Sequence, residues 1–324
     1  MNILDVIIIG AGPCGLSCAI EAHKKNLNYL LIDKGSITES IRRYPVNMIF
    51  FSTSENLEIG DVPFVSMGMR PTRLEALKYY RKVVNHFKLN IRLFSKVENI
   101  DRETSGLFKV ALSNDTLYCK KVIVATGYYD IPRYLNIPGE DLPHVNHYYD
   151  EAFKYSNTKV LVVGGANSAI EAALDLYRNN AKVTLVHMFE GLDKNAKYWI
   201  VPDLENRIKN GEVIAHFKSI VTLISEKSVA VQNLDDGKST IVEADFVFLM
   251  TGYHPDAEFL SRVGIELHGP HLIPSMDPET YETNVPGVYV AGSIVGGEET
   301  AKIFIENGRL HGARIIDDIV NKIS

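Results

Sequence analysis

The same order of strand, glycine-rich loop and helix occurs twice in this chain of 324 residues. The first copy is a continuous apolar run over 3–9 that enters the loop Gly10-Ala11-Gly12-Pro13-Cys14-Gly15. The second is an apolar run over 159–163 that enters a loop over 164–169. Short β-branched runs without alternation are typical of strands buried in a parallel sheet. The repeat predicts an α/β chain with two Rossmann-like dinucleotide-binding domains.

The order of the remaining strands predicts how the two domains share the chain. Apolar runs over 122–124 and 246–249 each end in Thr-Gly, and each is followed by a loop that contains proline. We interpret these two points as crossings between domains. The sequence therefore predicts a domain over 127–251 inserted into a discontinuous first domain made of 1–126 and 252–324. Two domains suit this length, because domains commonly have about 150 residues.

The first loop has the spacing of a dinucleotide-binding turn. Gly10 permits the tight turn, Gly12 lets the backbone approach a pyrophosphate, and Gly15 lets the helix pack on the strand. The helix N-terminus offers free N–H groups and a positive dipole end to the phosphates. Asp33 follows the next apolar run, where a carboxylate can accept the ribose hydroxyls. We expect an adenine dinucleotide here.

The second loop departs from this pattern at two positions. Ala166 stands in place of the middle glycine between Gly164 and Ala169, and His187 stands where an acid would read the ribose. A carboxylate would repel a 2′-phosphate, so its absence favours NADPH over NADH. Each candidate cation for that phosphate is equally compatible with a solvated surface charge. These candidates are His187, Lys194, Lys197 and Arg207.

The three cysteines form no CxxC pair and are too few for a disulfide framework. Cys14 lies in the first turn of the first helix, where the helix dipole would lower its pKa and cofactor phosphates would raise it. A redox role and a packing role for Cys14 both remain open from the residues alone. Cys18 lies on the same helix face, and we interpret it as packing because a bridge within the helix would be strained. Cys119 precedes a buried strand without an evident partner.

The overall charge restricts the class of partner and the location. The net charge is −6 and the pI is about 5.9, which argues against nucleic-acid binding because basic surfaces bind phosphate backbones. No apolar run approaches the roughly 20 residues of a spanning helix, so we expect no membrane insertion. The first strand begins almost at Met1 and leaves no room for a signal peptide. We expect a cytoplasmic protein without a bound metal.

The whole chain resembles the low-molecular-weight thioredoxin reductase superfamily, in the order of its GxGPCG, ATG, second glycine loop, second Thr-Gly and GVYVAG segments. Within it, the chain is most similar to the bacillithiol disulfide reductases of the YpdA type. The more specific resemblance rests on Gly12-Pro13-Cys14-Gly15, Tyr44-Pro45, Met48, Phe50-Phe51-Ser52-Thr53-Ser54-Glu55, Leu57-Glu58-Ile59-Gly60, Lys197-Tyr198-Trp199, Pro202-Asp203 and Lys302-Ile303-Phe304-Ile305-Glu306-Asn307-Gly308-Arg309.

The resemblance implies FAD as prosthetic group, NADPH as hydride donor, and bacillithiol disulfide or a bacilliredoxin mixed disulfide as electron acceptor. It also favours a redox role for Cys14, which would form a mixed disulfide with the substrate. We further expect a homo-oligomer. Beyond the loop residues above, the resemblance implies further contacts to the two cofactors. For FAD these are Pro13, Lys34, Ser52, Thr126, Gly127, Gly292 and Ser293, and for NADPH they are Asn167 and Ser168.

Two features differ from the wider superfamily. Thioredoxin reductases carry a redox-active CxxC pair in the nicotinamide domain, and residues 127–251 contain no cysteine. Ser293 stands where the superfamily usually has an aspartate that contacts the ribityl chain of the flavin.

A C-terminal helix is expected from about Thr300 to Lys322, and its N-terminus beside a flavin would hold negative charge on the reduced ring. Lys302 would add to this effect or would be a surface residue.

Two other functions fit the same fold. A ferredoxin–NADP reductase also lacks CxxC, but an acidic ferredoxin needs a basic docking face, which the net charge of −6 disfavours. A non-catalytic redox sensor would bind both cofactors and signal by conformation. A flavin monooxygenase is less well supported, because no FxGxxxH-type signature is present.

Overall fold

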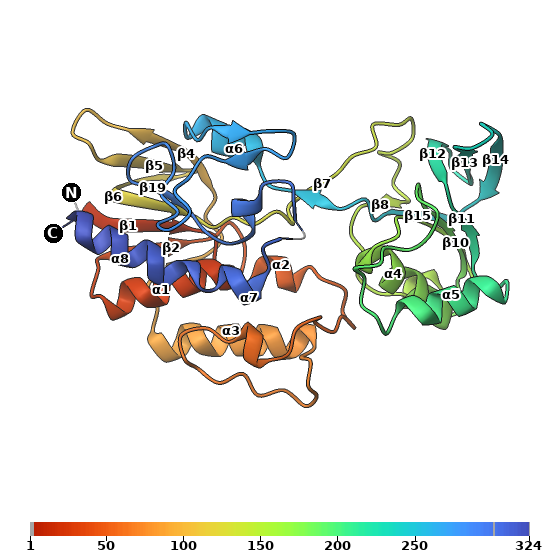
Figure 1. Ribbon diagram of the computed structural model, residues 1–324, viewed down its shortest axis with the longest axis horizontal. Coiled ribbons are helices and arrows are strands. Elements are labelled where there is room, and N and C mark those ends of the chain that lie inside the picture. The colour runs from red at the N-terminus through yellow and green to blue at the C-terminus, as the bar shows by residue number, and fades with distance from the viewer. Residues whose placement is uncertain (1–2, 301, 324) are drawn as a thin grey trace. The chain divides into compact units, whose positions relative to one another are not determined.

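The computed structural model describes residues 3–300 and 302–323, which divide into two compact units. The first comprises the chain up to Arg42, Ile49–Ile131 and the chain from Tyr253 onward. The second comprises Arg43–Met48 and Pro132–Gly252. The chain passes between them at the short strands β7 (Ile131–Pro132) and β16 (Tyr253–His254) (Figure 1).

The boundaries differ from those expected: residues 127–131 belong to the first unit, Gly252 belongs to the second, and a further segment also changes unit. Arg43–Met48 belongs to the second unit, although the sequence assigned it to the first. The N–H of Val46 donates to the carbonyl of Asp150 at 2.9 Å, and the Arg43 guanidinium lies 4.3 Å from the centre of the Tyr148 ring. No strand or helix pattern marks this segment, so no local feature of the sequence separates it from its neighbours.

A seven-stranded sheet forms the centre of the first unit. Its path runs β3-β2-β1-β6-β5-β4, and β19 also pairs with β6. The first half of β6 pairs antiparallel with β5, and its second half pairs parallel with β19. The predicted strands of the first βαβ unit have the expected bounds. The strands are β1 (Ile3–Ile9), β2 (Tyr29–Ile32), β3 (Ile91–Arg92), β4 (Val97–Arg102), β5 (Phe108–Leu112), β6 (Asp115–Val124) and β19 (Val288–Val290).

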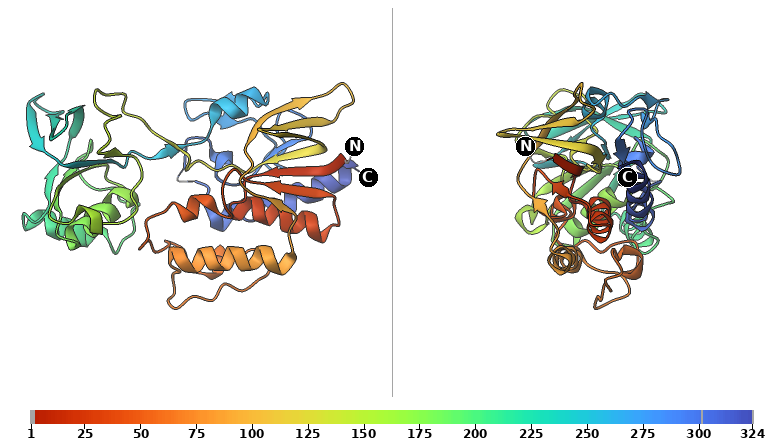
Figure 2. Two further views of the ribbon diagram at one scale, coloured as in Figure 1. Left: turned by 180° about the vertical axis from the view of Figure 1, so that it is seen from behind. Right: turned by 90° about the vertical axis from the view of Figure 1, so that its left-hand side faces the viewer.

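Helices α1 and α8 lie side by side on one face of this sheet, with α3 beyond α1 (Figures 1 and 2). Gly312 permits the approach of α8, because a Cβ there would lie 2.8 Å from the backbone nitrogen of Cys18. A capping box between Thr72 and Glu75 begins α3. The helices are α1 (Pro13–Lys24), α2 (Glu39–Arg42), α3 (Arg73–Phe87), α6 (Ala257–Arg262), α7 (Ile305–Gly308) and α8 (His311–Ile323), with short 3₁₀ helices η1 (Glu55–Leu57) and η3 (Gly292–Gly296) and strands β17 (Leu267–His268) and β18 (Ile273–Pro274).

The second unit has a five-stranded parallel sheet in the order β11-β10-β9-β15-β8 and a three-stranded antiparallel sheet. Its apolar residues form two buried clusters around the parallel sheet. The elements are β8 (Val145–Asn146), η2 (Phe153–Tyr155), β9 (Lys159–Val163), α4 (Asn167–Arg178), β10 (Lys182–Val186), α5 (Val201–Lys209), β11 (Ile214–His216), β12 (Ser219–Ile224), β13 (Ser228–Asn233), β14 (Ser239–Glu243) and β15 (Phe246–Leu249). The predicted α/β class with two Rossmann-like units is confirmed.

None of the helices in the described ranges, 3–300 and 302–323, has the length and apolar character needed to cross a membrane.

Candidate functional site

Four strands of the first unit end at the same edge of its sheet. Ile9 of β1 pairs with Ile32 of β2 and with Val124 of β6, and Val124 pairs with Val290 of β19. The strands are parallel, so the residues that follow each carboxyl end lie together. These are the predicted residues Gly10, Asp33, Thr126, Gly127, Gly292 and Ser293.

Gly10, Gly12 and Gly15 of the first loop differ in how much space a side chain would have. Gly10 has a φ of +107°, and a Cβ there would lie 2.4 Å from the carbonyl oxygen of Ala125. A Cβ at Gly15 would lie 1.8 Å from the carbonyl oxygen of Gly10. A Cβ at Gly12 would meet nothing within 4 Å. The fold therefore requires Gly10 and Gly15, whereas the open backbone of Gly12 fits a ligand such as a pyrophosphate.

The N-terminus of α1 begins at this open position. Gly12 is its N-cap, Pro13 is in the first turn, no side chain caps the helix, and no acidic residue lies in that turn. Proline suits this place because it has no N–H to leave unpaired. The other first-turn N–H groups and the positive helix dipole are therefore available to an anion.

Asp33 joins the loop to the end of β2. One carboxylate oxygen accepts the N–H of Ala11 at 2.6 Å, and the other accepts the N–H of Gly35 at 2.7 Å. Burial raises the pKa of Asp33, and these two hydrogen bonds oppose that shift. Each oxygen keeps a second lone pair for a ribose hydroxyl. The neighbouring Lys34 forms a 2.9 Å ion pair with Asp130.

The Cys14 thiol lies where α1 meets η3 and α7. A Cβ at Gly292, whose φ is +76°, would lie 2.9 Å from the Cys14 sulfur, and a Cβ at Gly308 would lie 2.8 Å from it. Burial, to which the charge of Glu306 adds, raises the pKa of Cys14 to about 12. The residue is half-buried, and its thiol is protonated at neutral pH. Cys18 and Cys119 are fully buried, and burial raises their pKa values as well.

Ser293 and Gly127 lie close together at the ends of β19 and β6. Gly127 has a φ of +70°, and a Cβ there would lie 3.7 Å from Ser293 Oγ. Ser52 is half-buried in the segment before η1. In the described part of the chain, Ser52 makes no hydrogen bond to the residues at these strand ends.

His311 belongs to this region and was missed from the sequence. Its Nδ1 accepts the N–H of Gly292 at 3.2 Å, and its ring stacks on Tyr281 with centroids 4.1 Å apart. Burial, helped by the charge of Arg314, lowers the pKa of His311 to about 4, so the ring is neutral. No spacing pattern in the sequence connects His311 to Gly292, because only the fold brings α8 to η3.

The C-terminal helix predicted from about Thr300 is wrong at its start. Ala301 lies outside the described residues, and the first helical segment, α7, begins at Ile305. Asn307 Oδ1 accepts the N–H of Phe304 at 2.8 Å, and its Nδ2 donates to the carbonyl of Lys302 at 3.0 Å. The Asn307 side chain thus takes the place of the backbone hydrogen bonds that an additional helical turn before Ile305 would form. Lys302 is therefore outside the helix, exposed, and paired with Glu299 at 2.5 Å.

The second glycine loop has the same arrangement at the carboxyl edge of the other sheet. Gly164 has a φ of +131°, and a Cβ there would lie 2.5 Å from the carbonyl oxygen of Met250. A Cβ at Gly165 would lie 2.4 Å from His187 Nε2, so the imidazole covers this glycine. Ala166 is exposed as the N-cap of α4, which has no side-chain cap and no acid in its first turn. This helix end, which includes Asn167 and the exposed Ser168, also suits an anion.

The predicted cations differ in their environment. Lys197 is only 5% exposed, and its Nζ lies 2.5 Å from Glu171 Oε1. The structure therefore places Lys197 in the interior and not at a phosphate site. Burial lowers the pKa of His187 against the influence of Asp193, so its ring is neutral at neutral pH.

Arg207 and Lys194 lie at the surface of the second unit. Arg207 forms ion pairs with Asp203 at 3.2 Å and Glu212 at 2.9 Å. Lys194 is exposed and forms no ion pair within the described residues. Of the four predicted cations, Lys194 is the one whose charge is available to a bound phosphate.

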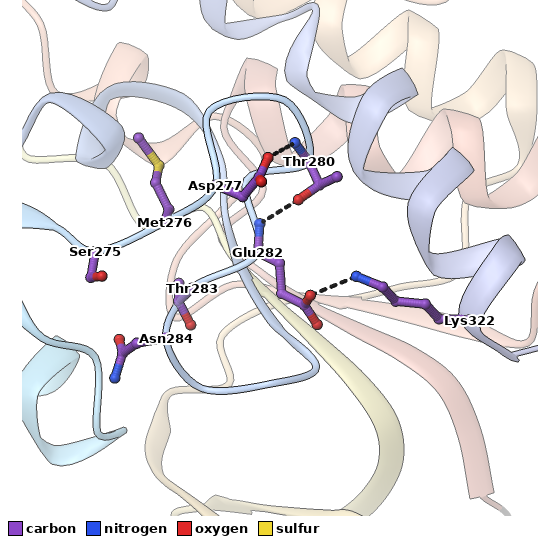
Figure 3. A pocket seen from close by; sticks show the side chains of 8 residues that line it. All are labelled: Ser275, Met276, Asp277, Thr280, Glu282, Thr283, Asn284 and Lys322. Atoms are coloured by element: carbon purple, nitrogen blue, oxygen red, sulfur yellow. Dashed lines mark hydrogen bonds and ion pairs between the residues drawn. The ribbon is translucent and has the colours of Figure 1, made fainter.

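A surface cavity of about 340 Å³ lies apart from these strand ends, near the C-terminus of α8 (Figure 3). None of the predicted site residues lines it. Its charged side chains bind one another or nearby backbone: Lys322 pairs with Glu282 at 2.5 Å, and Asp277 accepts the N–H of Thr280 at 2.9 Å. In the described ranges no cluster of three or more His, Cys, Asp or Glu side chains could hold a metal.

Comparison with known proteins gives consistent similarities. A family described as pyridine nucleotide-disulphide oxidoreductase matches residues 7–292. The chain is 42% identical over 316 residues to a Bacillus subtilis protein named bacilliredoxin reductase Bdr, covering 98% of this chain and 97% of that protein. Structures described as bacillithiol disulfide reductase Bdr (YpdA) from Staphylococcus aureus and Bacillus cereus both have TM-scores of 0.96. They are 40% and 39% identical, and the alignments cover 100% and 99% of this chain and 100% of each of those chains.

Proposed function

Because the chain belongs to the pyridine nucleotide-disulphide oxidoreductase family, we propose that it uses FAD and NADPH to reduce a low-molecular-weight disulfide. The substrate is oxidised bacillithiol or a mixed disulfide with bacilliredoxin. The observation that carries this proposal is the 42% identity, over 98% of the chain, to a protein named bacilliredoxin reductase. The family resemblance predicted from the sequence motifs is thereby confirmed, and the chain is an oxidoreductase.

The first unit would hold FAD at the carboxyl edge of its sheet. The open backbone at Gly12 and the uncapped N-terminus of α1 suit the pyrophosphate, and Asp33 suits the ribose. Thr126, Gly127 and Ser293 follow the ends of the neighbouring strands and would also contact the FAD. When bound, FAD accepts a hydride and supplies two electrons to a disulfide.

The second unit would hold NADPH at its own glycine loop. The N-terminus of α4, with Gly164, Ala166, Asn167 and Ser168, suits the pyrophosphate. Lys194 supplies the charge for the 2′-phosphate, and neutral His187 covers the loop beside it.

Cys14 would carry the exchange with the substrate. Its thiolate attacks one sulfur of the disulfide, a new S–S bond forms to Cys14, and the other half leaves as a thiol. Two electrons that originate from NADPH then return Cys14 and the second half to thiols. The enclosed, protonated state of the thiol means that attack first requires loss of a proton.

The test is NADPH oxidation by the purified protein, with bacillithiol disulfide, ferredoxin and oxygen offered separately. We expect a yellow protein that releases FAD, not FMN, on denaturation and that oxidises NADPH rapidly with the disulfide alone. Faster oxidation with ferredoxin would overturn the proposal in favour of a ferredoxin reductase. A colourless protein that does not take up FAD would overturn the cofactor assignment itself.

A further inference from the structure

Lys197 is the one lysine or arginine in the buried set of the described residues. A buried ammonium is costly unless it is paired and hydrogen-bonded. Lys197 Nζ meets this need through Glu171 Oε1 at 2.5 Å. Glu171 lies on α4, one turn after the N-terminus that faces the second glycine loop. The pair therefore joins the start of α4 to a segment that follows β10.

That segment, residues 188–199, is bound to the same place by two further hydrogen bonds. The backbone N–H of Lys197 donates to Asn167 Oδ1 at 2.7 Å. The N–H of Asp193 donates to the carbonyl of Gly165 at 2.9 Å. Lys194 lies between these two anchors and is exposed. We call residues 188–199 the clasp, since they close over the glycine loop and the first turn of α4.

We propose that Lys197 is a positioning residue, which holds the clasp against the second glycine loop through Glu171 and so sets the affinity for NADPH and NADH alike. Lys194, carried by the clasp, distinguishes the two nucleotides through the 2′-phosphate. This inference rests on the proposed function, because it requires a nicotinamide dinucleotide at the second loop.

The burial of Lys197 separates its role from that of a phosphate ligand. A 2′-phosphate needs a cation that solvent can reach, and the charge of Lys197 is already balanced by Glu171 inside the unit. Ordering a loop before the ligand arrives improves affinity for every ligand that contacts the loop. A single surface cation beside the 2′-position improves affinity for the nucleotide that carries a phosphate there.

The test compares Lys197→Met with Lys194→Met in the full-length flavoprotein, by the equilibrium dissociation constants of NADP⁺ and NAD⁺. Both changes remove an ammonium and keep an unbranched stem. We expect Lys197→Met to raise both constants about tenfold and to leave their ratio within about twofold of the unmodified protein. We expect Lys194→Met to raise the constant for NADP⁺ about tenfold or more and to leave that for NAD⁺ unchanged.

Glu171→Gln changes the other member of the pair. It leaves the Lys197 ammonium buried without its counter-charge, so we expect both constants to rise with their ratio unchanged, as in Lys197→Met. Trp199, the single tryptophan, lies in the clasp and reports on it without any nucleotide. Its fluorescence anisotropy should decay faster in Lys197→Met and should be unchanged in Lys194→Met.

A tenfold change for NADP⁺ alone in Lys197→Met would overturn the inference, because it would make Lys197 a phosphate ligand. Two unchanged constants would also overturn it and would leave the ion pair as packing. If Lys197→Met does not fold, the double variant Lys197→Met, Glu171→Met removes both charges, avoids a lone buried carboxylate and takes the same test. An unmodified protein that binds neither nucleotide overturns both proposals. One that binds nucleotide but reduces no disulfide overturns the proposed function alone.

Discussion

A Cβ atom at Gly308 would lie 2.8 Å from the sulfur of Cys14, so the thiol fills space that α7 leaves open only because it has a glycine there. Gly308 is not in the left-handed region, and its need for glycine arises from packing and not from backbone strain. The Cys14 sulfur is therefore a point of close packing between the first glycine loop and the C-terminal segment of the chain.

Gly308→Ala should lower the free energy of unfolding by about 1–3 kcal/mol, because the added methyl group overpacks the contact with Cys14. Cys14→Ala in the same chain removes the sulfur and should recover more than half of that loss. Urea unfolding of the two single variants and the double variant measures this coupling. Strictly additive losses would show that the two residues do not share the space.

Gly12→Ala and Gly15→Ala should separate cofactor binding from folding within one loop. A Cβ at Gly12 meets nothing within 4 Å, so the apoprotein should lose less than about 1 kcal/mol, while FAD affinity falls at least about tenfold. A Cβ at Gly15 would lie 1.8 Å from a backbone oxygen, and this variant should not yield folded protein. Circular dichroism and FAD titration test both. Unchanged FAD affinity in Gly12→Ala would mean that no phosphate approaches that backbone.

Cys14→Ser should keep FAD and flavin reduction by NADPH but lose disulfide turnover. The hydroxyl fits the space between Gly292 and Gly308, and its much higher pKa makes it no nucleophile at neutral pH. Visible absorbance of bound FAD, stopped-flow flavin reduction and steady-state turnover measure the three properties. Mass spectrometry of the unmodified protein locates a trapped bacillithiol adduct. The adduct should be on Cys14 and not on the buried Cys18 or Cys119. Loss of FAD along with turnover would assign Cys14 to packing, and undiminished turnover would mean that the disulfide is reduced without any protein thiol.

Disulfide turnover should increase with pH if the Cys14 thiolate is the attacking group. The pKa of about 12 keeps the thiol protonated over the whole working range, so the thiolate fraction increases about tenfold for each pH unit. The logarithm of the disulfide-dependent rate should therefore have a slope of about one between about pH 7 and 9. Flavin reduction by NADPH, followed separately, should lack this slope. A flat profile for both reactions would argue against a limiting attack by Cys14.

The sequence predicted those parts of the fold that depend on local pattern. The strand over Ile3–Ile9 and the helix that follows Gly12 are as expected, because each has a continuous apolar run or a glycine spacing with one structural solution. The start of the C-terminal helix was not predictable in this way, because Asn307 binds the backbone of Phe304 and Lys302 in place of a helical turn.

The site residues that were misplaced or missed depend on partners far away in the sequence. Lysine side chains usually lie at the surface, and only the pairing with Glu171 allows Lys197 to be buried. His311 lies in an ordinary amphipathic helix, and only the approach of α8 to η3 brings its ring to Gly292. Neither relationship has a spacing that a reader of the sequence can recognise.

The pairing of β19 with β6 fixes an order of events during synthesis. Val124 cannot pair with Val290 until Val290 has been synthesised. At roughly 5–20 residues per second, this happens on the order of ten seconds after Val124. All strands of the second unit, from β8 to β15, emerge within that interval. The nascent first unit therefore stays open at the edge where Gly292 and Ser293 belong until the inserted unit has had time to fold.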